Sequence, residues 1–280
     1  MTPITFFKFV KKSVLYLSLL IIVVVAIFPL FWIFLSSLKT PSDIFAPERM
    51  LIFSPTLTNY ARLFEFGTFP SDLLNSVIIS LVSISIAMVV GIFAGYSLSR
   101  FRFKHEKSFL FFALTTRMGP AVAFALPFYL LYKDFGLIDT YLGMFIIYTF
   151  FNLAFAIWMS KIFFDEVPKQ FEESAMVCGC SRLGAFRRIT LPLASRGLIV
   201  AALLCFIFTW NEFFYAMILT RSTARTFTVS LLQFVGAPRI RWELLFAASA
   251  IAASIPIIIS IILRKYLIKG LTFGLVKGKE

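Results

Sequence analysis

The sequence predicts an all-α membrane protein with six transmembrane helices. Of its 280 residues, 60% are hydrophobic and only 15% are charged, whereas about 25% are charged in a typical soluble domain. Six apolar stretches have the roughly 20 residues needed to cross a bilayer. They are 14–35, 73–99, 109–132, 140–160, 197–220 and 244–263. A soluble α/β protein with buried strands is the alternative, but its strands would be shorter and broken by turns.

The first span has features of a secretory signal peptide, because Lys8, Lys11 and Lys12 precede an apolar run. However, 14–35 is longer than a typical hydrophobic region of such a peptide, and no convincing cleavage site follows it. We therefore expect a helix that is retained in the protein.

The second span contains small residues at helical spacing. Gly91 and Gly95 form a GxxxG step, which allows the backbone of another helix to approach closely. Because this pattern is also common in apolar helices, a packing role and a chance occurrence both stay open.

The third span carries a charge and three helix-breaking residues. Arg117 lies about 12 Å into the span at 1.5 Å per residue, followed by Gly119-Pro120 and then Pro127. The prolines predict a kinked or broken helix. A broken helix beside a buried charge is a common way to build a transport pathway, but Arg117 also has the length to reach the headgroups. Both interpretations remain.

The fourth and sixth spans contain no charged residue, whereas the fifth contains Glu212, directly after Trp210-Asn211. Ionisable groups inside a membrane usually face a cavity or the bundle interior. Glu212 either faces the pathway or reaches the outer interface. Arg117, Asn211 and Glu212 are thus candidate pathway residues.

The positions of the basic residues predict the orientation. With the N-terminus inside, the inner segments 1–13, 100–108, 161–196 and 264–280 carry Lys and Arg at roughly twice the density of the outer segments. Both termini are therefore expected in the cytoplasm. This asymmetry, together with anionic lipid at the inner surface, accounts for the net charge of +13, so the charge is no argument for nucleic-acid binding.

The longest inner segment, 161–196, is a polar loop with its own helical pattern. Pro168 is suited to the start of a helix. Val167, Phe171, Ala175 and Cys178 then follow at helical spacing and predict one apolar face. Gly179 provides a stop, because glycine adopts positive φ at little cost. The two alternatives for such a helix are insertion into a groove on another protein and a position on the membrane surface.

A second helix is predicted after the glycine turn. Ser181 is a suitable cap for it, and we expect the helix to run through Phe186 and Ile189 and to stop at Leu191-Pro192.

The three cysteines, Cys178, Cys180 and Cys205, are not placed to form an extracellular disulfide. Cys178-Gly-Cys180 has no second pair of ligands, and the sole histidine, His105, lies in another loop. We therefore expect small residues in a tight turn and no metal site.

The loop resembles a known family signature. Glu173-x-Ala175-x-x-x-Gly179, then nine residues, then Ile189-x-Leu191-Pro192 is similar to the EAA motif of permease subunits of binding-protein-dependent ABC importers. Ser174 stands where that family usually has alanine. The predicted position, between the fourth and fifth helices, is also where the family carries this motif.

Other segments resemble the carbohydrate-type branch of these permeases, so the likeness covers nearly the whole chain. These segments are 28–39 with Asn59-Tyr60, then 136–143, 210–213 and 270–278.

This resemblance implies a type I importer permease fold and a specific set of partners. They are a second homologous permease, two ATP-binding cassette subunits, an extracytoplasmic substrate-binding protein and membrane lipid. The loop would be a coupling helix held in a cleft of one ATPase subunit. The expected docking residues are Phe171, Glu173, Ala175, Gly179 and Arg182. Glu173 would make the electrostatic contact.

The resemblance also implies an organisation and a cargo. Residues 1–70 would hold the N-terminal tail, first span and first outer loop, 71–265 the permease core, and 266–280 a basic cytoplasmic tail. The expected cargo is a sugar or oligosaccharide; glycerol-phosphate, a polyol or an amino acid is the alternative.

Two further function classes remain as rivals. The sequence has no phosphate-binding GxxxxGK[ST] motif, so ATP hydrolysis would belong to partner subunits and no cofactor is expected. A membrane-embedded enzyme would need more intramembrane polar groups than Arg117, Asn211 and Glu212. A membrane sensor or scaffold would use the loop to bind a soluble partner but would transport nothing.

Overall fold

The computed structural model describes residues 3–65, 67–101, 103–236 and 240–272, and these residues contain helices and loops but no strand. They fall into two compact units. Unit 1 comprises Met1–Phe69 and Leu231–Ile255, and unit 2 comprises Pro70–Ser230 and Pro256–Glu280. The predicted all-α class is confirmed, and each unit is described by itself.

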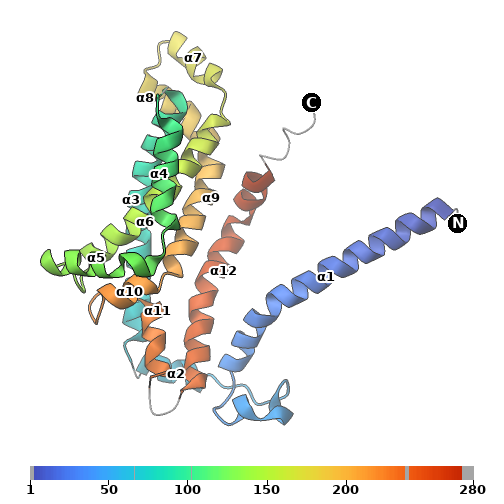
Figure 1. The fold of residues 1–280 in the computed structure, drawn as a ribbon. Coiled ribbons are helices and arrows are strands. Elements are labelled where there is room, and N and C mark those ends of the chain that lie inside the picture. The colour runs from blue at the N-terminus through green and yellow to red at the C-terminus, as the bar shows by residue number, and fades with distance from the viewer. Residues whose placement is uncertain (1–2, 66, 102, 237–239, 273–280) are drawn as a thin grey trace. The chain divides into compact units, whose positions relative to one another are not determined.

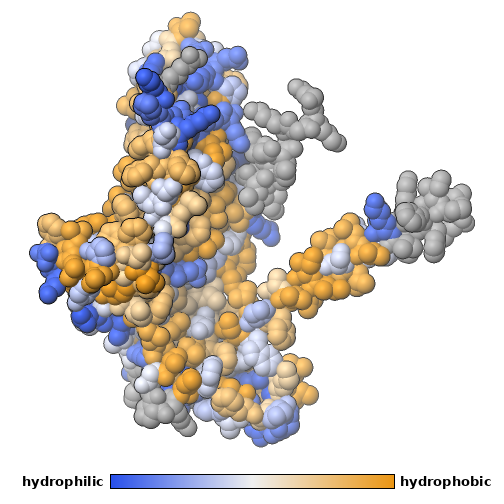
Figure 2. All heavy atoms as spheres, viewed as in Figure 1, coloured by the Kyte–Doolittle hydropathy of each residue, from blue (hydrophilic) through white to orange (hydrophobic). Residues whose placement is uncertain are grey.

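Unit 1 contains one long exposed helix and several short ones. Its elements are α1 (Pro3–Ser37), η1 (Asp43–Phe45), η2 (Pro47–Arg49), α2 (Thr58–Glu65), η4 (Leu231–Phe234) and the first part of α12 (Trp242–Thr272). The large apolar side chains of α1 from Val14 to Phe28 are more than a third exposed, and Figure 2 shows the coloured part of α1 as mostly hydrophobic. A surface of this kind is stable only against lipid or another membrane protein.

A buried lysine organises the segment that follows α1. The Lys39 Nζ donates to the carbonyl of Met50 at 2.8 Å and lies 4.9 Å from the ring centroid of Trp32. Asn59 Nδ2 donates to the carbonyls of Ser37 and Lys39 at 2.9 and 2.8 Å. The segment 28–39 and the pair Asn59-Tyr60, which the sequence analysis grouped together, therefore meet in one polar cluster.

Unit 2 is a bundle of long helices with a short helical loop at one end (Figure 1). Its elements are α3 (Phe69–Arg100), which begins at the last residue of the first segment of unit 1, α4 (Glu106–Met118), α5 (Ala121–Asp134), α6 (Tyr141–Asp165), α7 (Lys169–Val177), α8 (Arg182–Ala185), the π-helical η3 (Phe186–Thr190), α9 (Leu191–Trp210), α10 (Phe214–Leu219), α11 (Phe227–Ser230) and the remainder of α12. Helix α6 packs against both α9 and α4.

The membrane-spanning segments match the prediction in number. Five helices among the described residues are long and apolar enough to cross a membrane, and α4 with α5 makes a sixth if the bent pair is one span. The five are Lys11–Ser37, Phe69–Arg100, Tyr141–Asp165, Arg182–Trp210 and Trp242–Leu267.

The predicted break in the third span is confirmed. Helix α4 ends at Met118, α5 begins at Ala121, and the two axes are bent by 89°. Gly119 adopts φ −66° and ψ 145°, the extended conformation that a following proline imposes. Pro127, in contrast, is accommodated inside α5.

The fifth span is broken, which the sequence did not predict. Instead of one helix over 197–220, α9 ends at Trp210 and α10 begins at Phe214. The Glu212 carboxylate accepts hydrogen bonds from the backbone N–H groups of Tyr215 and Ala216, at 2.9 and 3.2 Å. These N–H groups lack partners at a helix start, so Glu212 stabilises a new helix within the apolar stretch.

The GxxxG step of α3 packs against α6. A Cβ atom on Gly91 would lie 2.7 Å from the Cβ of Ala156, and one on Gly95 would lie 2.7 Å from the Cβ of Ser160. Such distances leave no room for a side chain, so the packing interpretation is correct. Going from Gly91 to Gly95 along α3, the contact on α6 moves from Ala156 to Ser160, so the two helices run in the same direction.

Candidate functional site: the loop between α6 and α9

The first helix of the loop, α7, begins and ends as the sequence predicts. Pro168 precedes its first residue, and Gly179 has φ +86°. The N–H of Cys180 donates to the carbonyl of Ala175 and that of Gly179 to Met176, both at 3.0 Å. This pair of bonds is the Schellman motif. Because a Cβ on Gly179 would meet no described atom within 4 Å, the positive φ, not crowding within the chain, favours glycine here.

The second helix does not stop at Leu191-Pro192, so that prediction is wrong. Ser181 caps it as expected, accepting a hydrogen bond from the Gly184 N–H at 3.1 Å. The helix then continues through η3 into α9, with the Leu191 N–H bonded to the Phe186 carbonyl. Pro192 lacks an N–H and crowds the preceding turn, and a wider π turn relieves this conflict. The loop is therefore continuous with a membrane span.

A buried carboxylate that the sequence analysis missed attaches α7 to the bundle. The Glu172 side chain is 5% exposed. It accepts hydrogen bonds from Arg100 Nε at 2.7 Å, from Tyr96 Oη at 3.0 Å and from Thr190 Oγ1. Burial opposes ionisation of Glu172, but the hydrogen bonds from Thr190, Arg100 and Tyr96 outweigh it, so the pKa of this carboxyl is lowered.

Arg100 extends the attachment to the end of α6. Its Nη1 donates to the carbonyl of Phe164 at 3.0 Å, and its Nη2 donates to the carbonyl of Val167 at 3.1 Å. Together, Arg100 and Glu172 connect α3, the end of α6, α7 and η3. Interactions of this kind between ionised, buried groups are strong because both charges are also hydrogen-bonded.

The predicted apolar face of α7 is only partly correct. Val167 is buried and Ala175 is half-buried, but Phe171 and Cys178 are exposed. The buried position on α7 belongs to Glu172, because its ion pair with Arg100 turns that side of the helix inward. Phe171 consequently lies at the surface, where it is 53% exposed.

The outward surface of the loop carries apolar side chains among charged ones. Phe171 is 53% exposed, Val177 88% and Leu183 65%. Glu173, Arg187 and Arg188 are also exposed. We call Phe171, Val177 and Leu183 the apolar tip. In Figure 2 the end of unit 2 with α7 is largely hydrophilic, with hydrophobic residues at its extremity.

The predicted docking residues lie on both short helices of the loop, α7 with its glycine turn and α8. Phe171, Glu173 and Gly179 are exposed and Ala175 is half-buried on α7 and its turn. Arg182 begins α8, is exposed, and places its guanidinium carbon 5.0 Å from the ring centroid of Phe101. The structure therefore presents four of the five on the surface, on two connected helices.

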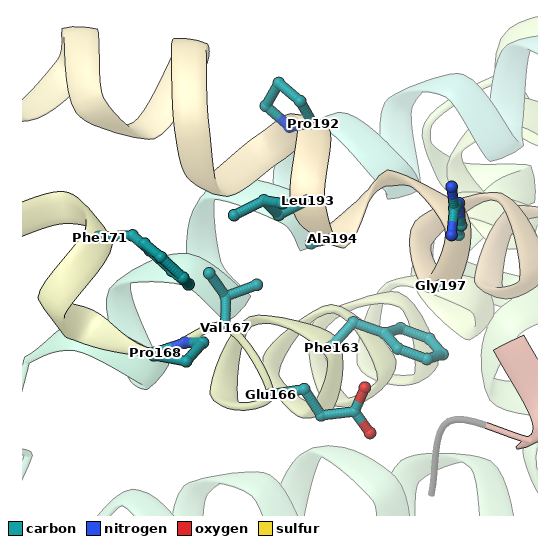
Figure 3. Close-up of a pocket in the computed structure, with 10 residues that line it drawn as sticks. Phe163, Glu166, Val167, Pro168, Phe171, Pro192, Leu193, Ala194 and Gly197 are labelled. Atoms are coloured by element: carbon teal, nitrogen blue, oxygen red, sulfur yellow. The ribbon is translucent and has the colours of Figure 1, made fainter.

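An apolar pocket of about 290 Å³ lies beside this surface. Figure 3 shows Phe171, Val167 and Leu193 directed into one space from α7, the connection between α6 and α7, and α9, with the Glu166 carboxylate at the side. Pro192, Ala194, Arg196 and Gly197 also line it. The pocket has the size to receive an apolar side chain.

Two of the three predicted pathway residues share a second cavity, within the bundle. Arg117 and Glu212 both line it, together with side chains of α6 and α9. Asn211 is exposed, donates to the carbonyl of Ile207 at 2.8 Å and does not line this cavity.

The opposite end of unit 2 has its own ordered loop. Asp139, just before α6, accepts hydrogen bonds at 2.9–3.2 Å from the consecutive backbone N–H groups of 221–224. Burial opposes its ionisation, but these four backbone donors outweigh burial and hold the pKa of Asp139 well below its usual value. Nearby, Arg225 forms an ion pair with the buried Asp72 at 2.9 Å.

The described residues contain no group of three or more His, Cys, Asp or Glu side chains that could hold a metal ion. Cys178, Cys180 and Cys205 are free thiols.

The comparisons with known proteins agree with this architecture. Residues 87–273 match the family "Binding-protein-dependent transport system inner membrane component". The chain is 35% identical to the trehalose transport system permease protein SugB of Mycobacterium tuberculosis, over 90% of this chain and 93% of that one. It is 33% identical to the maltodextrin transport system permease protein MdxG of Bacillus subtilis, over 97% and 98%.

A solved structure shares the fold. It is a chain of a bacterial ABC transporter that imports the acidic polysaccharide alginate, with a TM-score of 0.76 and 23% identity over 95% of this chain and 98% of that one. The chain belongs to the family of inner membrane components of binding-protein-dependent transport systems. It is a multi-pass permease subunit of the cytoplasmic membrane, and it is a transport subunit, not an enzyme.

Proposed function

We propose that this chain is one of two permease subunits of an ATP-driven importer for a sugar or oligosaccharide. A binding protein delivers the solute, two ATP-binding cassette subunits supply the energy, and the permease pair alternates between inward-facing and outward-facing states. The carbohydrate class is supported by the two relatives named for trehalose and maltodextrin transport, which match this chain over nearly their whole length.

In this proposal the α7–η3 loop is the coupling segment that binds an ATP-binding subunit. The observation that carries the proposal is the apolar tip on a loop that is otherwise charged. Exposed apolar side chains in such surroundings favour a protein partner over water. Phe171, Glu173, Ala175, Gly179 and Arg182 form the docking surface, with Glu173 as the charged contact.

The buried Glu172–Arg100 pair gives this docking segment a mechanical role. Movement imposed on α7 passes to α3 and to the end of α6 through charged hydrogen bonds of 2.7–3.1 Å. The continuous helix from α8 through η3 to α9 provides a second connection. A coupling segment has to be stiff in this way, because a loose one would absorb the motion of the ATPase.

The proposal includes an orientation and a division of the chain. By the positive-inside rule, the distribution of basic residues supports a cytoplasmic position for the α7–η3 loop and both termini. Residues 1–70 form the first span with its outer loop and 71–265 the permease core. The basic tail 266–280 begins within α12, which ends at Thr272, and its residues 273–280 lie outside the described residues.

The test is co-purification from native membranes in mild detergent, with wild type and Gly179→Asp compared. Wild type is expected to bring down an ATP-binding subunit and a second permease. Gly179→Asp should keep the permease and lose most of the ATPase, because the side chain strains the turn and projects from the docking surface. Loss of both partners, or of neither, would contradict the proposed role of the loop.

The chain offers a matched control in Gly136→Asp. Gly136 also has positive φ, +65°, and a Cβ there would also meet no described atom within 4 Å. Because of this positive φ, Gly136→Asp imposes a backbone strain similar to that of Gly179→Asp. Gly136 lies at the opposite end of unit 2 from the loop, so its substitution should leave ATPase binding intact.

A further inference from the structure

The cavity shared by Arg117 and Glu212 lies between interrupted helices. Its volume is about 150 Å³. The lining residues are Arg117, Tyr148, Phe151, Asn152, Phe208, Thr209, Glu212 and Tyr215. Arg117 lies just before the α4–α5 break and Glu212 lies within the α9–α10 break. Asn152 is the twelfth of the 25 residues of α6, which places it near the middle of that span. Substrate sites of transporters are commonly formed at this depth by discontinuous helices.

Most polar groups around the cavity already have partners. Glu212 accepts from the Tyr148 hydroxyl at 2.8 Å and from two backbone N–H groups of α10. Asn152 Nδ2 donates to the Tyr148 carbonyl at 2.8 Å and to Thr209 Oγ1 at 2.7 Å. Because a carbonyl can only accept, the bond to Tyr148 fixes which atom of the Asn152 amide is the donor.

Two groups remain without a hydrogen bond among the described residues, and they are complementary. One is Arg117 Nη1, a donor, and the other is Asn152 Oδ1, an acceptor; both atoms are buried. The Asn152 residue as a whole is 3% exposed. Buried polar groups nearly always have partners. Both residues line the same cavity, so a ligand there that accepts and donates hydrogen bonds would satisfy both groups.

The remaining walls are aromatic. The Phe151 and Tyr215 rings are stacked, with centroids 4.8 Å apart. The Arg117 guanidinium carbon lies 4.0 Å from the ring centroid of Phe208, and no ion pair within the described part of the chain joins Arg117 to a carboxylate. A ligand with an apolar ring face and polar edges fits such walls.

The geometry points to a binding site in this subunit for one neutral sugar ring, whose hydroxyl groups accept from Arg117 and donate to Asn152. A hydroxyl has both capacities. A phosphate or carboxylate would satisfy Arg117 alone, would offer no donor to Asn152, and would bring negative charge close to Glu212. A cavity of about 150 Å³ is large enough for one six-membered ring. This inference rests on the proposed transport function and gives it a site and a preference for uncharged solutes.

The experiment uses the complete transporter reconstituted in proteoliposomes with its binding protein. The solutes are radiolabelled trehalose, maltotriose and glycerol 3-phosphate. The variants are Arg117→Gln and Asn152→Leu, and the controls are Thr116→Val and Thr149→Val, which alter neighbouring polar residues outside the cavity. Uptake and ATP hydrolysis stimulated by the binding protein are measured on the same vesicles.

We expect each cavity variant to lower sugar uptake per ATP hydrolysed by about tenfold or more. The stimulated ATP hydrolysis and subunit assembly should be retained, and the controls should stay within about twofold of wild type. If Asn152→Leu fails to assemble, Arg117→Gln decides, because Nη1 of Arg117 makes no hydrogen bond that the fold would lose.

The failures of the two proposals are distinguishable. If wild type takes up a sugar and both cavity variants do so equally well per ATP, the sugar site is refuted and the transport function stands. If wild type takes up glycerol 3-phosphate and neither sugar, the proposed carbohydrate class is refuted and the site with it.

Discussion

At the two ends of α6, Asp139 and Glu172 each gather several donors around one carboxylate, but the donors differ in kind. Asp139 is bonded to four consecutive backbone N–H groups of a single loop, 221–224. Glu172 is bonded to side chains from α3 and η3. With 25 residues in α6, the two sites are about 37 Å apart along the helix.

This difference separates a site that shapes a loop from a site that links helices. The contacts of Asp139 fix the conformation of one short segment, so motion of the helices need not disturb them. Both carboxylates bond to segments far away in the sequence, but the contacts of Glu172 join helix α7 to α3 and η3, so α7 cannot move without pulling on them. The proposed coupling function depends on a site that links helices, as Glu172 does.

The largest expected effect follows from breaking the buried ion pair. Arg100→Gln leaves Glu172 buried without its counter-charge, and a loss of this kind costs about 3–5 kcal/mol. Glu172→Gln should cost less, because Arg100 keeps its hydrogen bonds to the carbonyls of Phe164 and Val167. Thermal unfolding of the purified protein in detergent would measure both.

The double variant supplies the internal control. If the two residues act as a pair, Arg100→Gln with Glu172→Gln should cost less than the two single changes together, with a coupling energy of about 1–3 kcal/mol. Additive effects would mean that the two side chains stabilise the protein independently.

A smaller effect is expected at the other end. Asp139→Asn keeps one acceptor oxygen but loses the charge, and it should cost about 1–2 kcal/mol because solvent screens this half-buried group. Hydrogen exchange should accelerate at the amides of 221–224 and stay unchanged in α7. The exposed Asp134→Asn is the control. Faster exchange in α7 would show that the two ends are not independent.

The pKa directions predict how these sites respond to acid. Asp139 and Glu172 both have pKa values lowered from their usual 3.8 and 4.5. Their stabilisation is therefore present in full above those values and is lost as pH falls through the lower pKa of the folded state. The difference in melting temperature between wild type and Asp139→Asn should thus be constant near neutral pH and shrink below about pH 4. A difference that grew in acid would contradict the assigned direction.

The smallest change in stability is expected at the two glycine turns. Gly136→Ala and Gly179→Ala each place a side chain at positive φ, and each should cost about 1 kcal/mol of stability. Only Gly179→Ala should also weaken ATPase co-purification, since its methyl group projects from the proposed docking surface. Equal loss of ATPase binding in both variants would point to general destabilisation.

Much of the fold could be predicted from the sequence, because membrane spans are defined by length and hydropathy. The break at Gly119-Pro120 and the glycine turn after α7 could also be predicted, since each depends on local backbone chemistry. The continuation of the helix past Pro192 was missed because the π turn that accommodates the proline has no sequence signature.

Glu172 was missed for a different reason. Which of two adjacent glutamates faces inward depends on the helix phase, and that is set by Arg100, 72 residues earlier in the chain. One signal was present: Arg100 directly follows the uncharged stretch 73–99, and a buried arginine there needs an acidic partner. The acidic residues of the loop 161–196, which are the candidates for this partner, are Asp165, Glu166, Glu172 and Glu173. The Glu212 cap within the fifth span likewise appears only when the helix ends are known.

Sugar uptake per ATP hydrolysed in the reconstituted transporter measures whether the Glu172–Arg100 pair transmits motion from α7 to α3. With Arg100→Gln we expect that the ATPase still binds and hydrolyses ATP while uptake per ATP falls about tenfold, because the link from α7 to α3 is cut. Asp139→Asn should leave the ratio unchanged. An unchanged ratio in Arg100→Gln, with the ATPase bound, would contradict the claim that this ion pair transmits the motion.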